Sequence, residues 1–232
     1  MRVVAGRARG TALTAPPDGR TRPTADRIKE DLFNIIARNA AGASFLDMYS
    51  GTGQIGIEAL SRGAARAVFV ESDRRSAELI RKNIAKCRLD FATVICDDAL
   101  RALGRPSLTG QPFDIVFLDP PYDTEELPEI LAALTGGGLL RDGALVICEQ
   151  AVKAPPVDIP GLHVYRLKEY STTKLTFMEY IAVPIENRLR ASSEIALKPA
   201  IPTRSQSFSK RNNYICTKHQ EDSIDGNLLR QL

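Results

Sequence analysis

The stretch Phe45-Leu-Asp-Met-Tyr-Ser-Gly51-Thr-Gly53-Gln-Ile-Gly56 contains the turn that decides the fold. A short apolar run over 44–48 leads into this turn, and a helical pattern over 55–62 follows it. Glycines allow the chain to turn sharply and let its backbone approach a ligand closely, because no Cβ stands in the way. The stretch therefore predicts a strand, a tight ligand-binding turn and a helix.

On both sides of this turn, short apolar runs alternate with helical patterns. The expected strands are 44–48, 67–71, 92–96, 113–118 and 144–149, and the expected helices are 55–62, 74–87, 99–103 and 125–134. Such alternation predicts an α/β fold with a parallel sheet covered on both faces. The segments 162–169 and 174–182 are separated by only a short loop, so they should pair antiparallel. We therefore expect a seven-stranded, mostly parallel sheet with an antiparallel last strand.

The two ends of the chain depart from this pattern. Residues 2–14 read as two short strands, which predicts an N-terminal β-hairpin. Thr24 is expected to cap a helix that runs to about Arg38. Residues 185–232 are rich in polar and basic residues without a sustained period, and we expect them to be disordered. The expected organisation is a hairpin and connector over 1–23, the α/β domain over 24–184 and a basic tail over 185–232.

Composition and charge narrow the functional classes. The 232 residues are 44% hydrophobic and 25% charged, as is usual for soluble globular proteins. No apolar run approaches the roughly 18 residues of a membrane span, and the four cysteines lack metal-like spacing. Residues 1–30 hold seven Lys/Arg against three Asp/Glu, whereas 31–150 hold twelve against seventeen. Basic ends suit a polyanionic partner, or simply a solvated surface. We expect a cytoplasmic monomer.

Candidate ligand-binding residues follow the first three strands of the domain. Glu71 lies twenty residues beyond Gly51, where its carboxylate can accept both ribose hydroxyls of a nucleoside. The spacing of Gly51 and Gly53 also fits a dinucleotide fingerprint. Asp47 would repel a pyrophosphate, but it suits the positively charged amino acid end of S-adenosylmethionine. Asp98 can take the adenine amino group, cap the following helix, or do both.

A second hint of dinucleotide chemistry does not hold. Tyr170 and Lys174 have the Tyr-x3-Lys spacing of short-chain dehydrogenases, in which a helix brings the two side chains together. The surrounding residues are β-branched and aromatic and predict a strand. Four strand residues separate the pair by roughly 13 Å. We therefore reject hydride transfer.

The sequence Asp119-Pro120-Pro121-Tyr122 follows the apolar run at 113–118. The two prolines fix the backbone, remove two N–H donors and leave carbonyl acceptors. Together with the Asp119 carboxylate, these carbonyls can hold an exocyclic amino group with its lone pair turned toward an approaching methyl. Tyr122 offers a flat face on which a base can stack. The motif predicts methyl transfer to an amine, and no metal is required.

These motifs together resemble the bacterial 16S ribosomal RNA guanine-N2 methyltransferase family, which is RsmD-like and acts on guanine 966. The resemblance covers residues 1 to about 183 and rests on Arg22-Pro-Thr24-Ala-Asp26-Arg27, Asp31-Leu-Phe-Asn34, Asp47-Met-Tyr-Ser-Gly51-Thr-Gly53, Ile57-Glu-Ala-Leu-Ser-Arg-Gly63 and Asp119-Pro120-Pro121-Tyr122. It implies a Rossmann-like fold that uses S-adenosylmethionine, and 16S rRNA in the small ribosomal subunit or an assembly intermediate as partner.

The resemblance also implies roles for individual residues. The cofactor site would be lined by Asp47, Gly51, Gly53, Glu71 and Asp98, and the target base would be held by Asp119, Pro120 and Tyr122. Arg22 and Thr24 would lie at the mouth, closing over the cofactor or contacting RNA, or would only form a proline-fixed entry into the helix. Three alternatives stay open: N6-adenine methylation of DNA or RNA, methylation of a protein glutamine, and a non-catalytic RNA-binding or assembly factor.

Overall fold

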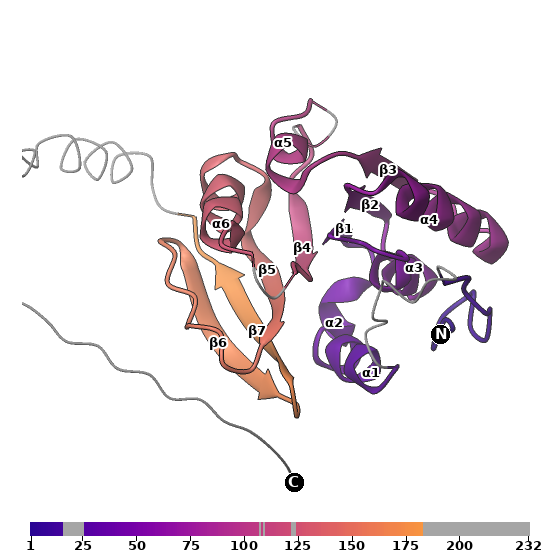
Figure 1. Cartoon of the computed structure of the whole chain (residues 1–232), viewed down its shortest axis with the longest axis horizontal. Coiled ribbons are helices and arrows are strands. Elements are labelled where there is room, and N and C mark those ends of the chain that lie inside the picture. The colour runs from indigo at the N-terminus through magenta and orange to yellow at the C-terminus, as the bar shows by residue number, and fades with distance from the viewer. Residues whose placement is uncertain (16–25, 107, 109, 122–123, 183–232) are drawn as a thin grey trace, which may run out of the picture. The chain divides into compact units, whose positions relative to one another are not determined.

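The computed structural model describes residues 1–15, 26–106, 108, 110–121 and 124–182, all within the first of two units of the chain, Met1–Arg188. In chain order its elements are α1 (Asp26–Ile35), α2 (Ala37–Ala40), β1 (Ser44–Met48), α3 (Gln54–Ser61), β2 (Arg66–Glu71), α4 (Arg74–Cys87), β3 (Ala92–Cys96), α5 (Ala99–Leu103), β4 (Phe113–Leu118), α6 (Leu127–Gly136), β5 (Leu140–Ala151), β6 (Leu162–Glu169) and β7 (Thr173–Tyr180) (Figure 1). No helix in this described part of the chain is long and apolar enough to cross a membrane. The expected domain boundaries at 23 and 184 lie outside the described residues.

The seven strands form one sheet in the order β3-β2-β1-β4-β5-β7-β6. The first five strands pair parallel with their neighbours, and β7 runs antiparallel between β5 and β6. This confirms the predicted seven-stranded α/β sheet with an antiparallel last strand. The strand order reverses between β1 and β4, which is where open α/β sheets bind ligands at the carboxyl ends of their strands.

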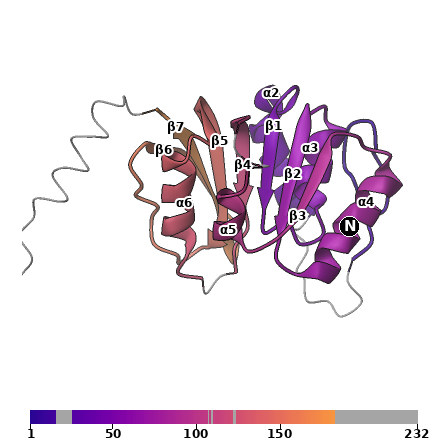
Figure 2. The same ribbon diagram turned by 90° about the horizontal axis from the view of Figure 1, so that it is seen from above.

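Two hydrophobic clusters cover opposite faces of the sheet. Phe45 and Leu46 are neighbours in β1 but belong to different clusters, as the alternation of side chains along a strand requires. One cluster includes side chains from α1, α3 and α4, and the other includes side chains from α5 and α6 (Figure 2). Because both faces are covered, β1 is buried throughout, including its polar residues Ser44 and Asp47.

The first predicted helix is interrupted. The single helix expected from Thr24 to Arg38 is observed as α1 and α2 with a break at Ile36, and Thr24 itself lies outside the described residues. The Ile36 carbonyl accepts hydrogen bonds from the N–H groups of Asn39 and Ala40, so a new helical turn begins there. Ile36 is fully buried, and its β-branched side chain adds little helix preference. The Ile36 N–H still donates to the Leu32 carbonyl at 3.1 Å, so the chain changes direction at this buried side chain without losing that helical hydrogen bond.

Strand β5 begins four residues earlier than the apolar run at 144–149 predicts. Phe113 pairs with Leu140 but Ile115 pairs with Leu145, so the register between β4 and β5 shifts. Gly143 has a φ of 77°, which a β-bulge can use. The polar segment before the run reads as a turn in the sequence, yet it belongs to an irregular strand. The bounds of α6 and β7 differ from the expected ones by one or two residues.

The N-terminal arm, residues 1–15, pairs as a hairpin through a short contact. Arg2 and Ala12 form an isolated antiparallel bridge, and the Val3 N–H donates to the Thr11 carbonyl at 3.0 Å. Within the described arm no strand extends beyond this bridge. The predicted hairpin is therefore present, although its two expected strands are not formed as regular elements.

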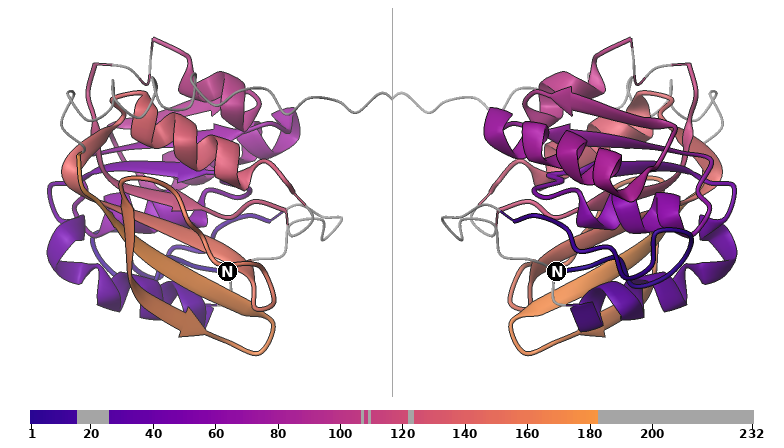
Figure 3. Two further views of the ribbon diagram at one scale, coloured as in Figure 1. Left: turned by 90° about the vertical axis from the view of Figure 1, so that its left-hand side faces the viewer. Right: turned by 90° about the vertical axis from the view of Figure 1, so that its right-hand side faces the viewer.

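Buried polar side chains dock the N-terminal arm on α3 and α4. The Glu58 carboxylate accepts the N–H groups of Val4 and Ala5 at 2.8 and 2.9 Å. The Asn83 carboxamide accepts the Thr14 N–H and donates to the Thr14 carbonyl. The right-hand view of Figure 3 shows the arm crossing this side of the molecule. The arm is thus an integral layer of the fold.

Residues 152–161 connect β5 to β6 without a helix. Val157 and Ile159 of this connection pack against the cluster that contains α5 and α6. On this face a loop therefore takes the place that a helix would occupy between two parallel strands.

Candidate functional site

The glycine turn after β1 has the left-handed backbone conformation that its glycines allow. Gly51 and Gly53 have φ values of 56° and 76°, which glycine adopts without steric cost. The Gly53 N–H donates to the Ser50 carbonyl at 2.7 Å, and α3 begins at the next residue. A Cβ at Gly56 would lie 2.4 Å from the Phe69 ring, so this third glycine serves close packing of α3 on β2.

Asp47 lies directly beneath this turn. It is 2% exposed, and its Oδ2 accepts the Gly56 N–H at 2.9 Å. Burial raises the pKa of Asp47 well above its usual value, and the negative charges of Asp119 and Glu71 raise it further. The carboxylate thus sits at the start of α3 in a field that favours a nearby cation.

Glu71 and Asp98 lie at the carboxyl ends of the neighbouring strands: Glu71 is the last residue of β2, and Asp98 follows β3. Glu71 accepts the Gly51 N–H on one oxygen and the Asp73 N–H on the other, each at 2.8 Å. Burial raises the pKa of Glu71. Asp98 is the N-cap of α5, and its Oδ1 accepts the N–H groups of Leu100 and Arg101. The capping role foreseen for Asp98 is confirmed, while its contact with a ligand stays a prediction.

Asp119 and Pro120 follow β4 next to the end of β1. Met48 and Leu118 are partners in the parallel register, and the Asp119 N–H lies 3.4 Å from the Met48 carbonyl oxygen. Pro120 is buried and Pro121 is exposed. The structure therefore brings the proline motif to the same edge of the sheet as the glycine turn, which the sequence could indicate only through strand order.

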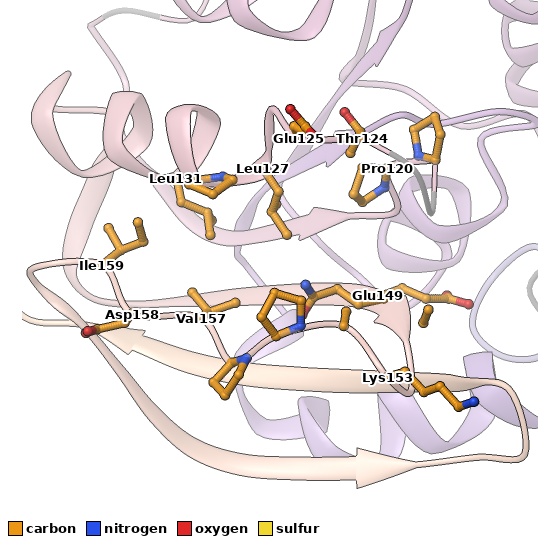
Figure 4. A pocket seen from close by; sticks show the side chains of 17 residues that line it. Pro120, Thr124, Glu125, Leu127, Leu131, Glu149, Lys153, Val157, Asp158 and Ile159 are labelled. Carbon is orange, nitrogen blue, oxygen red and sulfur yellow. The ribbon is translucent and has the colours of Figure 1, made fainter. Parts of the chain in front are cut away.

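A cavity of about 670 Å³ opens beside the proline motif. It lies between α6, the Pro120–Pro121 segment and the connection from β5 to β6 (Figure 4). Glu149 and Gln150, the residues near the end of β5, also line it. No motif in the sequence indicated this cavity, because it depends on the loop that replaces a helix after β5.

Three of the expected site residues are not placed by the structure. Arg22, Thr24 and Tyr122 lie outside the described residues, so their roles stay predictions. Tyr49, which the sequence reasoning did not single out, has a φ of 59° within the turn. Burial raises the pKa of the Tyr49 phenol to about 12. In the sequence, only its position as an aromatic residue within a glycine turn could have indicated that Tyr49 belongs to the site.

The Tyr170 and Lys174 side chains have different partners, although Tyr170 lies in the turn between β6 and β7 and the strand expected there is not formed. The Tyr170 hydroxyl donates to Asp31 Oδ2 at 3.1 Å, whereas the Lys174 ammonium donates to the Ala154 carbonyl. The two side chains therefore serve different partners.

The site as a whole is a set of carboxylates at the strand ends beside the glycine turn, called the carboxylate ring below. Its members are Asp47, Glu71, Asp98 and Asp119. Carboxylates accept hydrogen bonds from hydroxyl and amino groups and attract positive charge, and each oxygen can accept more than one bond. This set of acceptors fits a nucleoside ligand that carries positive charge, and it fits a pyrophosphate poorly.

Comparison with known proteins gives concordant matches. The family model described as conserved hypothetical protein 95 matches residues 1–179. Ribosomal RNA small subunit methyltransferase D of Escherichia coli K12 is 38% identical over 161 residues, which cover 69% of this chain and 80% of the relative. Its Haemophilus influenzae counterpart is 36% identical over 183 residues, covering 78% and 93%.

A solved Escherichia coli structure described as the methyltransferase yhhF superposes with a TM-score of 0.72 at 35% identity, covering 79% of this chain and 99% of its own. The fold, the motifs and these matches agree over the described sheet and its N-terminal arm. The chain therefore belongs to the conserved hypothetical protein 95 family, the RsmD-like family that its motifs resemble.

Proposed function

We propose that this protein transfers a methyl group from S-adenosylmethionine to the exocyclic N2 amine of guanine 966 in 16S rRNA. The observation that carries the proposal is the position of Asp119-Pro120 beside the glycine turn, at the point where the strand order reverses. The family membership supports an rRNA substrate, since the relatives are named as rRNA small-subunit methyltransferases. We propose the cytoplasm as the location and the small subunit or its assembly intermediate as the partner.

The carboxylate ring would hold the cofactor. Glu71 would accept ribose hydroxyls on oxygens that already accept backbone N–H groups. Asp98 would accept from the adenine amino group with Oδ2, because both of its capping bonds fall on Oδ1. Asp47 would stabilise the positive amino acid end through its field. Bound S-adenosylmethionine would supply an electrophilic methyl on a sulfonium.

Asp119 and the Pro120 carbonyl would orient the target amine. As acceptors, they would take its N–H bonds and direct its lone pair toward the methyl donor. Holding the two reactants in this geometry can lower the barrier by roughly 7–11 kcal/mol. The same acceptors would stabilise positive charge as it develops on the nitrogen. As the N–CH3 bond forms, the S–CH3 bond would break and leave a neutral thioether, and the methylated nitrogen would lose its proton to water. A base within a helix must first be flipped out, at a cost of a few kcal/mol.

The direct test is transfer of tritium from labelled S-adenosylmethionine to unmodified 30S subunits, free 16S RNA and duplex DNA, followed by nucleoside analysis. The expected product is N2-methylguanosine in ribosomal RNA. Label in N6-methyladenine would favour adenine methylation instead. Cofactor binding without any label would favour a non-catalytic assembly factor.

Two variants separate the predicted roles within the site. Asp119→Ala should lower kcat at least about a hundredfold and leave the cofactor Kd nearly unchanged. Asp47→Asn should raise the cofactor Kd roughly ten- to hundredfold, because it removes the charge while its amide oxygen can still accept the Gly56 N–H. Titration calorimetry and single-turnover rates measure both. Full turnover by Asp119→Ala would show that the Asp119 carboxylate does not take part in methyl transfer.

A further inference from the structure

The cavity beside the proline motif has many apolar and proline side chains in its walls, and the polar residues among them include the buried Glu149 and Gln150. Its walls include Leu127 and Leu131 of α6, together with Val157 and Ile159 of the connection after β5 (Figure 4). A volume of about 670 Å³ is typical of sites that bury a small organic ligand. Such sites are apolar apart from a few polar atoms that orient the ligand.

Gln150 supplies the polar atom. The residue is only 9% exposed, and among the described residues its Oε1 has no hydrogen-bond partner. Cys148, two residues earlier in β5, belongs to the cluster with α5 and α6, so alternation directs Gln150 toward the same face. Gln150 accordingly lines the cavity. A buried carboxamide oxygen without a partner is destabilising and requires an explanation.

The sheet register puts Gln150 next to the amine-binding motif. Leu118 of β4 and Cys148 of β5 are partners in the parallel register. Pro120 and Gln150 each lie two residues beyond this last pair, Pro120 after the end of β4 and Gln150 still within β5. Both residues line the same cavity. An amine held at Pro120 would therefore present the adjoining atom of its ring to Gln150.

We propose that Gln150 binds the Watson–Crick edge of the target guanine, with Oε1 accepting the N1–H and the amide N–H donating to O6. This inference rests on the proposed function and adds the residue that reads the ring beside the methylated amine. In guanine the amine-bearing carbon C2 lies between N3, an acceptor, and N1–H, a donor, and only the N1 side adjoins O6. In adenine the corresponding N1 is an acceptor. The partner that Oε1 lacks among the described residues is thus a donor that guanine supplies.

Two substitutions at this position test the contact. Gln150→Leu should lower kcat/KM for 30S subunits roughly ten- to hundredfold, because the guanine N1–H would be buried without an acceptor. The same variant should melt about 2–4 °C higher, since it no longer buries an unpartnered oxygen. Cofactor Kd should not change. A residue with only a structural role would not give lower activity together with higher stability.

Gln150→Glu distinguishes which base is read. At a pH where it is ionised, the carboxylate only accepts, so it should keep the guanine N1–H bond but lose the bond to O6, and it should restore only part of the activity that Gln150→Leu loses. An adenine N1 would be repelled by it. Gln111→Leu is the matched control, because Gln111 is exposed before β4 and outside the cavity, and it should leave activity unchanged.

The outcomes separate this inference from the proposed function. If the wild type forms N2-methylguanosine and Gln150→Leu keeps the wild-type kcat/KM, the Gln150 contact is wrong and the proposed function stands. If the wild-type product is N6-methyladenine, both the proposed function and the Gln150–guanine contact are wrong, whatever the variants show. Loss in Gln150→Leu with partial recovery in Gln150→Glu supports the contact.

Discussion

Asp31 joins α1 to the turn between β6 and β7. Its Oδ2 accepts hydrogen bonds from the Lys168 ammonium at 2.7 Å and from the Tyr170 hydroxyl at 3.1 Å. The hydrogen bond from Lys168 is the main reason why the pKa of Asp31 lies below its usual value. These bonds connect elements that are far apart in the sequence but adjacent in the fold.

The lowered pKa of Asp31 predicts a pH dependence. A carboxyl group whose pKa is depressed on folding stabilises the fold above its unfolded pKa, about 3.9, and this contribution is lost as the pH falls through the folded value. Lys168→Met should therefore lower the free energy of unfolding modestly at pH 7, with the difference from wild type closing below about pH 4. Urea titrations across pH measure this, with Lys86→Met on the exposed side of α4 as control. A difference that persists unchanged at pH 2.5 would assign the loss to packing.

At the scale of elements, the N-terminal arm provides a matched pair of glycines. Gly6 and Gly10 have φ values of 80° and 84°, so alanine is strained at both. A Cβ at Gly6 would lie 1.8 Å from the Ser61 carbonyl oxygen, whereas a Cβ at Gly10 would meet nothing within 4 Å. Gly10→Ala should cost roughly 1–2 kcal/mol from strain alone, and Gly6→Ala should cost more because the arm must leave α3. Thermal melts and trypsin cleavage at Arg7 check this; equal losses would mean that the close approach to Ser61 is unimportant.

Elements whose stability is local were predictable, and those set by distant contacts were not. The bounds of β1, β3, β4, β6, α4 and α5 match the expected ranges, because apolar runs and amphipathic patterns carry that information within a few residues. The break at Ile36 and the early start of β5 depend on burial and on register with Phe113. The docking of the arm depends on Glu58, more than 50 residues away.

The same distinction holds for the site. Asp47, Gly51, Glu71 and Asp119 were expected from strand ends and turn chemistry, and the structure brings them to one edge of the sheet. Gln150 was not expected, because a glutamine near the end of an apolar run carries no chemical pattern. Its significance comes from the cavity and from an oxygen without a partner.

Over the whole molecule, positive and negative charge are separated. Acidic residues surround the glycine turn, whereas residues 74–88, which include α4, hold six Lys/Arg and the single acid Glu78. Arg75, Lys82 and Lys86 are exposed. A polyanion that reaches the acidic site would be repelled there, so cations outside the site must hold it. Among the described elements, α4 has the cations that best suit it to hold an RNA substrate.

This separation predicts the salt dependence of RNA binding. Removing one cation that binds a phosphate reduces the slope of log K against log salt by about 0.7–0.9. Combining Lys82→Gln with Lys86→Gln should make the slope for 16S RNA shallower by about 1.4–1.8 and leave cofactor affinity unchanged. Arg38→Gln with Arg166→Gln removes the same charge from exposed positions on α2 and β6. If both pairs reduce the slope equally, only net charge matters; if neither does, α4 does not bind the phosphates. A reduction confined to the α4 pair would identify this helix as the surface that holds the RNA while a base enters the site.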